Sequence, residues 1–191
     1  MIESNPKREL TMTKETDFEY HLKKVFELAE EMGVSDPLDK SKYREVITAN
    51  KLGHNLFFGA SGGKHNDATY GADATDSEGR KVEYKSCKVS KKDYEKFLRG
   101  ELKKKFSMVY NGAYSAENIE RYRDTRHVLT LFYNEKLLMS IEVPIDHVID
   151  SLYEVLERKE IRRAKGERVT TNCNSVMVPI VESKPSIGKV L

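Results

Sequence analysis

A turn flanked by two short segments, at residues 71–86, constrains the fold of this chain more than any other feature. The dipeptide Glu78-Gly79 is typical of a hairpin turn, because glycine readily takes a positive φ. If the turn is centred on residue 78, Asp73 on the first strand lies opposite Glu83 on the second. The segment therefore predicts a β-hairpin that brings two carboxylates together across its strands.

The second strand of this hairpin has two chemically different faces, because side chains alternate along a strand. Glu83 and Lys85 share one face, which places an ammonium group beside the carboxylates. Val82 and Tyr84 share the other face, which predicts packing against the rest of a sheet or a helix. An open alternative is an exposed hairpin whose cross-strand ion pairs contribute little to stability.

The charged face carries the groups that metal-dependent hydrolysis of a phosphodiester requires. A divalent ion lowers the pKa of bound water and ligates a phosphoryl oxygen. Mg²⁺ keeps several waters and needs only one or two carboxylates, which Asp73 and Glu83 supply. The main-chain carbonyl of Tyr84 can add a ligand, and Lys85 can hold the scissile phosphate and the attacking water. We therefore interpret the hairpin as the site of a metal-dependent DNA endonuclease.

The composition limits how such a protein binds DNA. The chain has 191 residues, 38% of them hydrophobic, which fits one domain with a real core. Its formal net charge is only +2, so DNA binding must come from local clusters of Lys and Arg. Cys87 and Cys173 lie far apart without a CxxC pair, and no apolar run is long enough to span a membrane. We expect a soluble cytoplasmic protein with no membrane partner.

We expect a single domain between a flexible N-terminal arm at residues 1–15 and a frayed tail at 183–191. The order of elements indicates an α/β or α+β fold with one central sheet. Within the domain we expect three regions, namely a helical region at 16–54, the catalytic sheet at 55–143, and a helix followed by strands at 144–182.

Two helices are predicted ahead of the sheet. Thr16 is the expected N-cap of the first, which ends at Gly33 and carries apolar residues at helical spacing: Phe18, Leu22, Val25, Phe26, Ala29 and Met32. The second is expected to begin at Asp39 or Ser41 and to end at Gly53, where glycine favours a C-cap.

The segments on either side of the hairpin leave two alternatives open. Asn55–Gly59 predicts a short strand, and the Gly-rich loop at 60–67 is either a flexible connector or a contact with DNA backbone. After the hairpin, Ser90 is expected to cap a strongly basic helix that is either a solvated face or a surface that follows phosphates. Its cations are Lys91, Lys92, Lys96, Arg99, Lys103, Lys104 and Lys105, and the following residues 108–112 are expected to end in a turn.

The C-terminal half predicts a hairpin, a helix and a last pair of strands. Residues 127–133 and 136–143 are strand patterns separated by Asn134-Glu135. Pro144 is expected at the first turn of a long helix that stops at Gly166. The last strands are expected at 168–171 and 176–181, joined by a turn at 172–175; a short helix is expected to begin at Ser115.

The hairpin also carries a family resemblance. The pattern Gly71-x-Asp73-Ala74-x-Asp76-x-x-Gly79-x-x-x-Glu83-x-Lys85-Ser86 resembles the catalytic hairpin of the PD-(D/E)xK nucleases, most closely the PvuII-type restriction endonucleases. Ala72 stands where the family usually has proline. The resemblance covers roughly residues 18–182, and it implies a restriction-endonuclease-like mixed central β-sheet flanked by helices.

The resemblance implies an activity, a cofactor and partners. It implies a type II restriction endonuclease, or a phage or homing nuclease, that cuts double-stranded DNA at a specific sequence with Mg²⁺, for which Mn²⁺ substitutes. Asp73 and Glu83 would be metal ligands and Lys85 the catalytic lysine. Glu45 on the second helix would be a further carboxylate; the alternative is that it is an ordinary surface residue of that helix. It also implies a homodimer formed through the N-terminal helical region, a separate DNA methyltransferase, and a bacterial, archaeal or phage origin.

Candidates for reading DNA follow from the same resemblance. Asn172, Asn174 and Ser175 are base-reading candidates, because asparagine bonds adenine in a bidentate way; the alternative is that they only form a turn. Tyr110, Asn111 and Tyr114 stand where the family often has DNA contacts, and Lys64 and Lys88 are further candidates. His65 and His127 lack a paired metal ligand at a suitable spacing and are expected to be ordinary histidines.

Two other functions remain open from the sequence. A Holliday-junction resolvase or repair nuclease of the same superfamily would recognise DNA shape instead of sequence. A non-catalytic DNA-binding α/β protein would use the charged hairpin only for ion pairs, although the intact set of Asp73, Glu83 and Lys85 argues against a decayed site.

Overall fold

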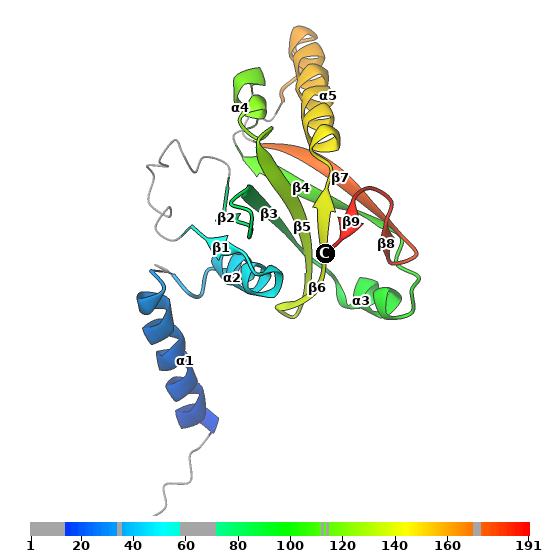
Figure 1. Ribbon diagram of the computed structural model, residues 1–191. Coiled ribbons are helices and arrows are strands. Elements are labelled where there is room, and N and C mark those ends of the chain that lie inside the picture. Colours follow the sequence, from blue (N-terminus) through cyan, green and yellow to red (C-terminus); the bar gives the residue numbers. More distant parts are fainter. Residues whose placement is uncertain (1–13, 34–35, 58–71, 112, 114, 170–172) are drawn as a thin grey trace, which may run out of the picture.

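A computed structural model describes residues 14–33, 36–57, 72–111, 113, 115–169 and 173–191 (Figure 1). The helices are α1 (Lys14–Glu31), α2 (Lys40–Leu52), α3 (Lys91–Leu98), α4 (Ala116–Glu120) and α5 (Ile145–Ala164). The strands are β1 (Asn55–Leu56), β2 (Ala74–Thr75), β3 (Lys81–Lys88), β4 (Lys104–Asn111), β5 (Thr125–Tyr133), β6 (Lys136–Val143), β7 (Cys173–Val181), β8 (Lys184–Pro185) and β9 (Lys189–Val190). No helix in these ranges has the length and apolar character needed to cross a membrane.

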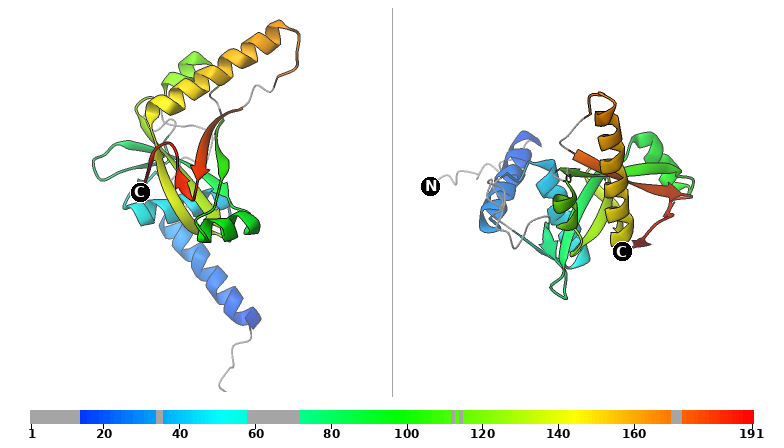
Figure 2. Two further views of the ribbon diagram at one scale, coloured as in Figure 1. Left: turned by 90° about the vertical axis from the view of Figure 1, so that its right-hand side faces the viewer. Right: turned by 90° about the horizontal axis from the view of Figure 1, so that it is seen from above.

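The strands form two sheets. The central sheet has the order β1-β2-β3-β5-β6-β9, in which β3 and β5 are parallel and the other neighbours antiparallel. The second sheet is antiparallel with the order β4-β7-β8. The protein is therefore a mixed α/β structure with a mixed central sheet flanked by helices, as expected (Figures 1 and 2).

Alternation along β3 and β5 gives the central sheet two buried faces. One face packs against the second sheet and α5 in a large core that includes Leu129, Leu131, Ile141, Met108 and Val176. The other face packs against α2 in a smaller core made of Ala49, Ala74, Val82, Tyr84 and Val128. The predicted apolar backing of the hairpin is thus confirmed, because Val82 and Tyr84 belong to this smaller core.

Several predicted boundaries are confirmed because local capping chemistry determines them. Asp39 is the N-cap of α2 and accepts a hydrogen bond from the backbone N–H of Ser41, and Gly53 ends the helix with φ of 67°. Pro144 is the N-cap of α5. Asn134 and Glu135 take positive φ values of 46° and 56°, the conformation of a tight hairpin turn between β5 and β6.

The first helix is present as predicted, but it begins before the predicted N-cap. Helix α1 begins at Lys14, so Thr16 lies within its first turn and is not the N-cap. Its apolar side chains stay largely uncovered: Phe18 is 69% exposed and Phe26 is 46% exposed. The helix projects away from the sheets in Figure 1, and within the described chain its apolar face is covered only near its C-terminal end, where Ala29 is buried.

The long basic helix predicted after Ser90 is wrong beyond its first two turns. Helix α3 ends at Leu98, and Gly100 takes φ of 74°. Lys104 and Lys105 instead begin β4, which runs to Asn111, and residue 112, at the expected turn, lies outside the described residues. The reason is tertiary: β4 pairs with β7 along its whole length and buries Phe106, Met108 and Tyr110.

Three predictions for the C-terminal segment are also wrong. Strand β7 begins at Cys173, so Asn174 and Ser175 lie within a strand and not in a turn, and residues 168–169 form no strand. The tail is not frayed, because β8 pairs with β7 and β9 pairs with β6. Asn172 lies outside the described residues.

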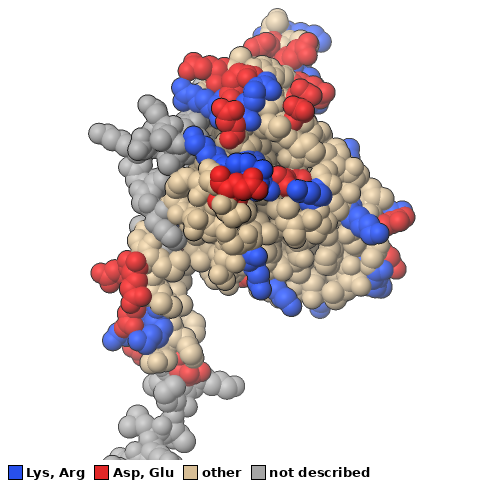
Figure 3. Space-filling model, in the orientation of Figure 1, with Lys and Arg blue, Asp and Glu red and all other residues tan. Residues whose placement is uncertain are grey.

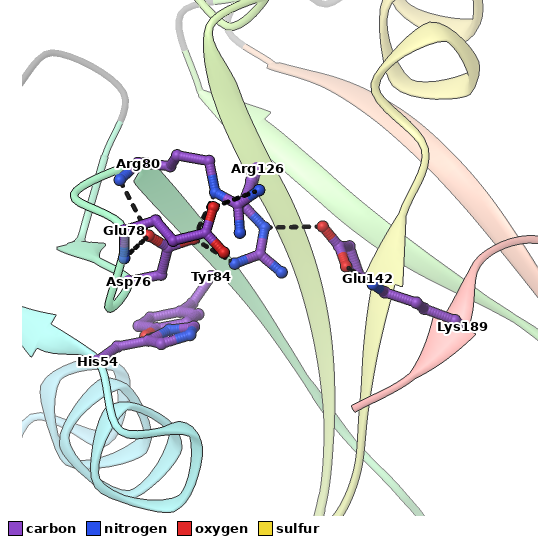
Figure 4. Close-up of polar contacts among 8 residues, drawn as sticks. All are labelled: His54, Asp76, Glu78, Arg80, Tyr84, Arg126, Glu142 and Lys189. Atoms are coloured by element: carbon purple, nitrogen blue, oxygen red, sulfur yellow. Dashed lines mark hydrogen bonds and ion pairs between the residues drawn. The ribbon is translucent and has the colours of Figure 1, made fainter.

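A chain of ion pairs fastens the hairpin turn to the rest of the sheet (Figure 4). Asp76 accepts hydrogen bonds from the backbone N–H groups of Glu78 and Arg80, both at 2.9 Å. Its other oxygen accepts from Arg80 Nε at 2.8 Å and from Arg126 Nη1 at 2.5 Å. Arg126 Nε also donates to Glu142 at 2.7 Å, and Lys189 pairs with Glu142 at 3.0 Å. The network thereby joins the hairpin turn, β5, β6 and β9.

The network lowers the pKa of its two carboxyl groups, Asp76 and Glu142. Burial raises the pKa of Asp76, but the hydrogen bonds from Arg80 and Arg126 outweigh it and hold the pKa well below the ordinary value. The hydrogen bond from Arg126 lowers the pKa of Glu142 to about 2. Both carboxylates therefore stabilise the fold above their ordinary pKa, and this contribution is lost as the pH falls toward the folded-state pKa. Figure 3 shows the paired cations and anions interspersed on this surface.

The substitution Arg126→Met tests whether the network stabilises the hairpin. It leaves the buried Asp76 with Arg80 as its remaining side-chain partner in the network, so we expect the free energy of unfolding at neutral pH to fall by about 3 kcal/mol. Urea unfolding measures the change. Arg123→Met removes a cation from an exposed ion pair and should leave the midpoint nearly unchanged. Equal effects of the two substitutions would contradict a structural role for the network.

Candidate active site

The candidate site lies where the hairpin partner of β3 ends. On β3, strand β2 pairs with Lys81 and Val82 alone, whereas β5 pairs with β3 along its whole length. Just beyond β2, the backbone N–H of Asp73 donates to Val82 O at 2.8 Å. The carboxylate of Asp73 then accepts from the backbone N–H of Tyr84 at 2.8 Å. Continued by one residue, this register places Asp73 opposite Glu83, as predicted. The side chain of Asp73 accepts the hydrogen bond that the backbone of a longer β2 would otherwise accept.

This hydrogen bond also fixes the direction of the Tyr84 carbonyl. In an extended strand the N–H and C=O of one residue point to the same edge. Since the N–H of Tyr84 points to Asp73, its carbonyl also points to that edge. The phenol of Tyr84 is anchored on the α2 face of the sheet, where its hydroxyl and His54 Nδ1 are hydrogen-bonded at 2.7 Å (Figure 4).

A pocket of about 290 Å³ lies at this edge of β3. Helix α2 contributes one wall and β4 the other, and both are brought there by packing against the two faces of the central sheet. The lining residues are Ser41, Arg44 and Glu45 from α2, Asp73, Tyr84, Lys85 and Ser86 from the hairpin, and Ser107, Val109 and Asn111 from β4. Ser41, Arg44, Ser107 and Val109 were not predicted as site residues, because only tertiary packing brings them to the hairpin.

Glu83 and Lys85 lie side by side on one face of β3, as predicted, and form an ion pair. Glu83 is only 6% exposed. Burial, together with the charge of Asp73, raises the pKa of Glu83 to about 8, although Lys85 acts in the opposite direction. The ammonium of Lys85 also lies 5.0 Å from the centre of the Tyr110 ring, a cation–π contact. The pair therefore combines a carboxyl that resists ionisation with a lysine held against an aromatic wall.

The structure places Glu45, the third candidate carboxylate, in the same pocket as Asp73. Burial and the charge of Asp73 raise the pKa of Glu45. Lys42 pairs with it at 2.7 Å, and the hydroxyl of Ser41 donates to it at 3.2 Å. Glu45 is thus a partly buried carboxylate of the site and not an ordinary surface residue of the helix.

Behind the ion pair lies a buried hydrogen-bonded chain. Burial lowers the pKa of His127 to about 4, so its ring is neutral at neutral pH. Its Nε2 lies 3.1 Å from the carbonyl of Tyr122, which can only accept, so Nε2 carries the proton. Nδ1 therefore accepts from the hydroxyl of Tyr110 at 3.0 Å. His127 is a core histidine, as expected, whereas Tyr110 is fully buried and the prediction that it contacts DNA is wrong.

The other predicted DNA-reading residues of β4 and β7 differ in whether they lie on the buried or the open face of the second sheet. Asn174 is buried and its amide hydrogen-bonds to the carbonyl of Ala113, so the prediction that it reads bases is wrong. Ser175 and Asn111 lie on the opposite, open face of the second sheet, and Lys88 is exposed at the end of β3. Lys64, His65, Tyr114 and Asn172 lie outside the described residues.

The donor set at the pocket fits a small divalent cation. The raised pKa values of Glu83 and Glu45 reflect burial beside other carboxylates, and a cation among them would relieve that cost. No three His, Cys, Asp or Glu side chains in the described segments converge tightly enough to hold an ion as they stand. Asp73, Glu83 and the Tyr84 carbonyl are nevertheless sufficient for Mg²⁺, which retains most of its waters.

Comparison with known proteins adds no assignment: no family model matches the chain, and no curated protein matches it significantly.

The burial of Glu83 predicts a pH-dependent effect of Glu83→Gln. With a pKa of about 8 in the folded protein and an ordinary value of 4.5, Glu83 loses its proton more readily in the unfolded chain. The free energy of unfolding should therefore fall as the pH rises between these values. In EDTA, E83Q should be more stable than the parent at pH 8, and the gain should shrink near pH 5.

Thermal unfolding at the two pH values measures this difference. Glu95→Gln, which changes an exposed carboxylate on α3, is the matched control and should behave as the parent at both pH values. An E83Q variant that is less stable than the parent at pH 8 would show that Glu83 is not a strained carboxyl.

Proposed function

We propose that this protein is a Mg²⁺-dependent endodeoxyribonuclease with a restriction-endonuclease-like fold, which hydrolyses phosphodiester bonds in double-stranded DNA. One observation carries the proposal: Asp73 and Glu83 face each other at an open strand edge, with Lys85 beside them. The pocket beside them is lined by Asp73, Glu45, Tyr84 and Lys85, and Glu83 is paired with Lys85. Carboxylates, an ammonium and a main-chain carbonyl are the groups that metal-dependent phosphodiester hydrolysis requires.

When bound, the metal ion would supply an activated water and polarise the phosphoryl oxygen. Asp73, Glu83 and the carbonyl of Tyr84 would hold the ion, and Glu45 on α2 would add a carboxylate to the same pocket. Lys85, which is paired with Glu83 in the structure, would hold the scissile phosphate. The Tyr110 ring keeps the ammonium in place and excludes water from one side, which strengthens the electrostatic interactions.

A sequence-specific endonuclease fits the charge distribution better than a structure-selective one. Enzymes that recognise DNA shape rely on extended basic surfaces, whereas this chain has a net charge of +2 and intersperses its cations with carboxylates (Figure 3). A type II restriction endonuclease is therefore our first assignment, with a separate methyltransferase to protect host DNA. A junction resolvase or repair nuclease of the same fold is the second.

We further propose that the enzyme acts as a homodimer through α1, so that each subunit cuts one strand. The apolar residues Phe18, Leu22, Val25, Ala29 and Met32 recur at alternating spacings of four and three along α1. That pattern is typical of a helix that packs along another helix. Val25 is 42% exposed, so the described chain leaves most of this seam uncovered. A second copy of α1 offers a surface of matching shape and polarity.

Cleavage of plasmid DNA tests the proposed activity. The parent should give discrete fragments with Mg²⁺ and none with EDTA. Asp73→Asn, Glu83→Gln and Lys85→Met should each reduce the rate by at least about 100-fold, because each removes a group that stabilises the transition state. Glu95→Gln should cut like the parent. Equal cutting by the three site variants would refute the site, and cutting of branched DNA alone would select the second assignment.

The dimer is tested by substitution within the α1 seam. Val25→Glu would bury a carboxylate between two helices, so we expect the dimer dissociation constant to rise by roughly tenfold or more. Analytical ultracentrifugation measures this change. Lys23→Glu alters an exposed charge of the same helix and should leave the association nearly unchanged. A parent protein that remains monomeric at micromolar concentration would contradict the proposal.

A further inference from the structure

Helix α5 continues beyond the body of the protein. Leu156 is its last buried residue, and the helix runs on to Ala164. In these last residues every side chain except that of Lys159 is exposed. Figures 1 and 2 show this end of α5 reaching beyond both sheets. We call residues 157–165 the projecting end of α5.

The charges of the projecting end are sorted by direction. Since a helix turns by about 100° per residue, its cations all fall within one arc of about 160° around the helix axis. They are Arg158, Lys159, Arg162, Arg163 and Lys165, and the two glutamates, Glu157 and Glu160, lie outside that arc. Alternation of sign along a helix face is typical of a solvated, ion-paired helix. The sorted pattern instead indicates a surface suited to a polyanion.

Most of this positive charge is not neutralised by neighbouring carboxylates. Arg162 pairs with the exposed Glu167 at 2.6 Å. Among the residues that the structure describes, no carboxylate forms an ion pair with Arg158, Arg163 or Lys165. The projecting end therefore presents a row of cations over about 10 Å of helix length.

The projecting end is tethered near the candidate active site. Residues 165–172 link Ala164 to Cys173, and Cys173 pairs with Asn111, which lines the pocket. An extended chain of that length spans at most about 32 Å. One turn of B-DNA is about 34 Å long. A duplex with one phosphate in the pocket therefore has further phosphates within reach of the projecting end.

Duplex nucleic acid is the polyanion that suits this arc best. A duplex carries roughly six phosphate charges over the 10 Å or so that the cations span. An anionic membrane would also attract cations, but a helix that lies on a membrane needs an apolar face that enters the lipid. In the projecting end Ile161 is the one large apolar residue, so a membrane surface fits poorly.

We propose that the projecting end of α5 binds the phosphate backbone of duplex DNA outside the segment that enters the pocket. The contact is independent of base sequence, lengthens the bound duplex by about one turn and supplies much of the salt-dependent affinity. The inference rests on the proposed function for DNA as the partner, but it concerns binding and does not require cleavage.

Fluorescence anisotropy of labelled duplexes tests this contact. The full chain carrying Asp73→Asn is titrated in EDTA against duplexes of unselected sequence, about one and about four helical turns long. A variant that combines Arg158→Gln, Arg162→Gln and Lys165→Gln should bind the longer duplex about tenfold or more weakly, with a smaller loss for the shorter one. Its plot of log affinity against log salt should be shallower by about 2 to 3, since each phosphate contact contributes about 0.9.

The matched control combines Lys91→Gln, Lys92→Gln and Lys96→Gln on α3. It removes the same formal charge, but Asp93 and Glu95 lie among those lysines. The control should keep the affinity and the salt dependence of the parent. Glutamine is a good helix former, so circular dichroism should show the same helix content in both variants.

The outcomes separate this inference from the proposed function. If the α5 variant loses DNA binding but the parent shows no cleavage with Mg²⁺, the inference stands and the nuclease assignment fails. If the parent cuts and the α5 variant keeps its salt dependence, the inference is wrong while the nuclease stands. Equal losses in the α5 and α3 variants would overturn the inference, because net charge alone would then explain binding. Binding to anionic vesicles instead of DNA through the projecting end would overturn it as well.

Discussion

The candidate site depends on the hydrogen bond between the Tyr84 backbone N–H and the carboxylate of Asp73. In a longer hairpin, another strand would accept that bond and would cover the edge of β3. Because β2 has only two residues, a side chain replaces the strand, and the Tyr84 carbonyl is left facing the same edge. Helix α2 and strand β4 then close on this edge from the two faces of the sheet and form the pocket. A carboxylate pair at an interrupted sheet edge is thus a direct consequence of strand length.

Such a site needs rigid support, since buried carboxylates repel one another. Burial raises the pKa of Glu83 to about 8, which means that ionised Glu83 opposes folding at neutral pH. The hairpin is held from its other end by Asp76 and Arg126, and from behind by the contact between Tyr84 and His54 (Figure 4). The strain at the site and the stabilising network around it lie on the same short segment of chain. Replacing Glu83 should therefore raise stability while it lowers activity, whereas replacing Arg126 should lower stability.

The sequence was sufficient where the controlling interactions are local. The Asp73–Glu83 pairing follows from the position of one turn and from the alternation of side chains between the two faces of a strand. The bounds of α2 follow from its caps at Asp39 and Gly53. It was insufficient where packing overrides local preference: the lysines at 103–105 continue a helical pattern, yet β4 forms because β7 offers a full set of backbone partners. The wrong predictions for Tyr110 and Asn174 have a simple cause. Side chains alternate between the two faces of a strand, so Tyr110 and Asn174 are buried whereas their neighbours Asn111 and Ser175, which were predicted with them, lie on the open face. Glu45 reached the site only through the packing of α2.

Calorimetric titration of the DNA-free protein with Mn²⁺ tests the central claim most directly, because it detects the metal site without reference to any DNA sequence. A carboxyl that holds its proton near neutral pH must release it when a cation binds. At pH 7, in two buffers of different ionisation enthalpy, the account predicts saturable binding with net proton release. Glu83→Gln should abolish that proton release. It also predicts much weaker binding by Asp73→Asn. Binding that is absent in the parent, or that is unchanged in both variants, would contradict the account.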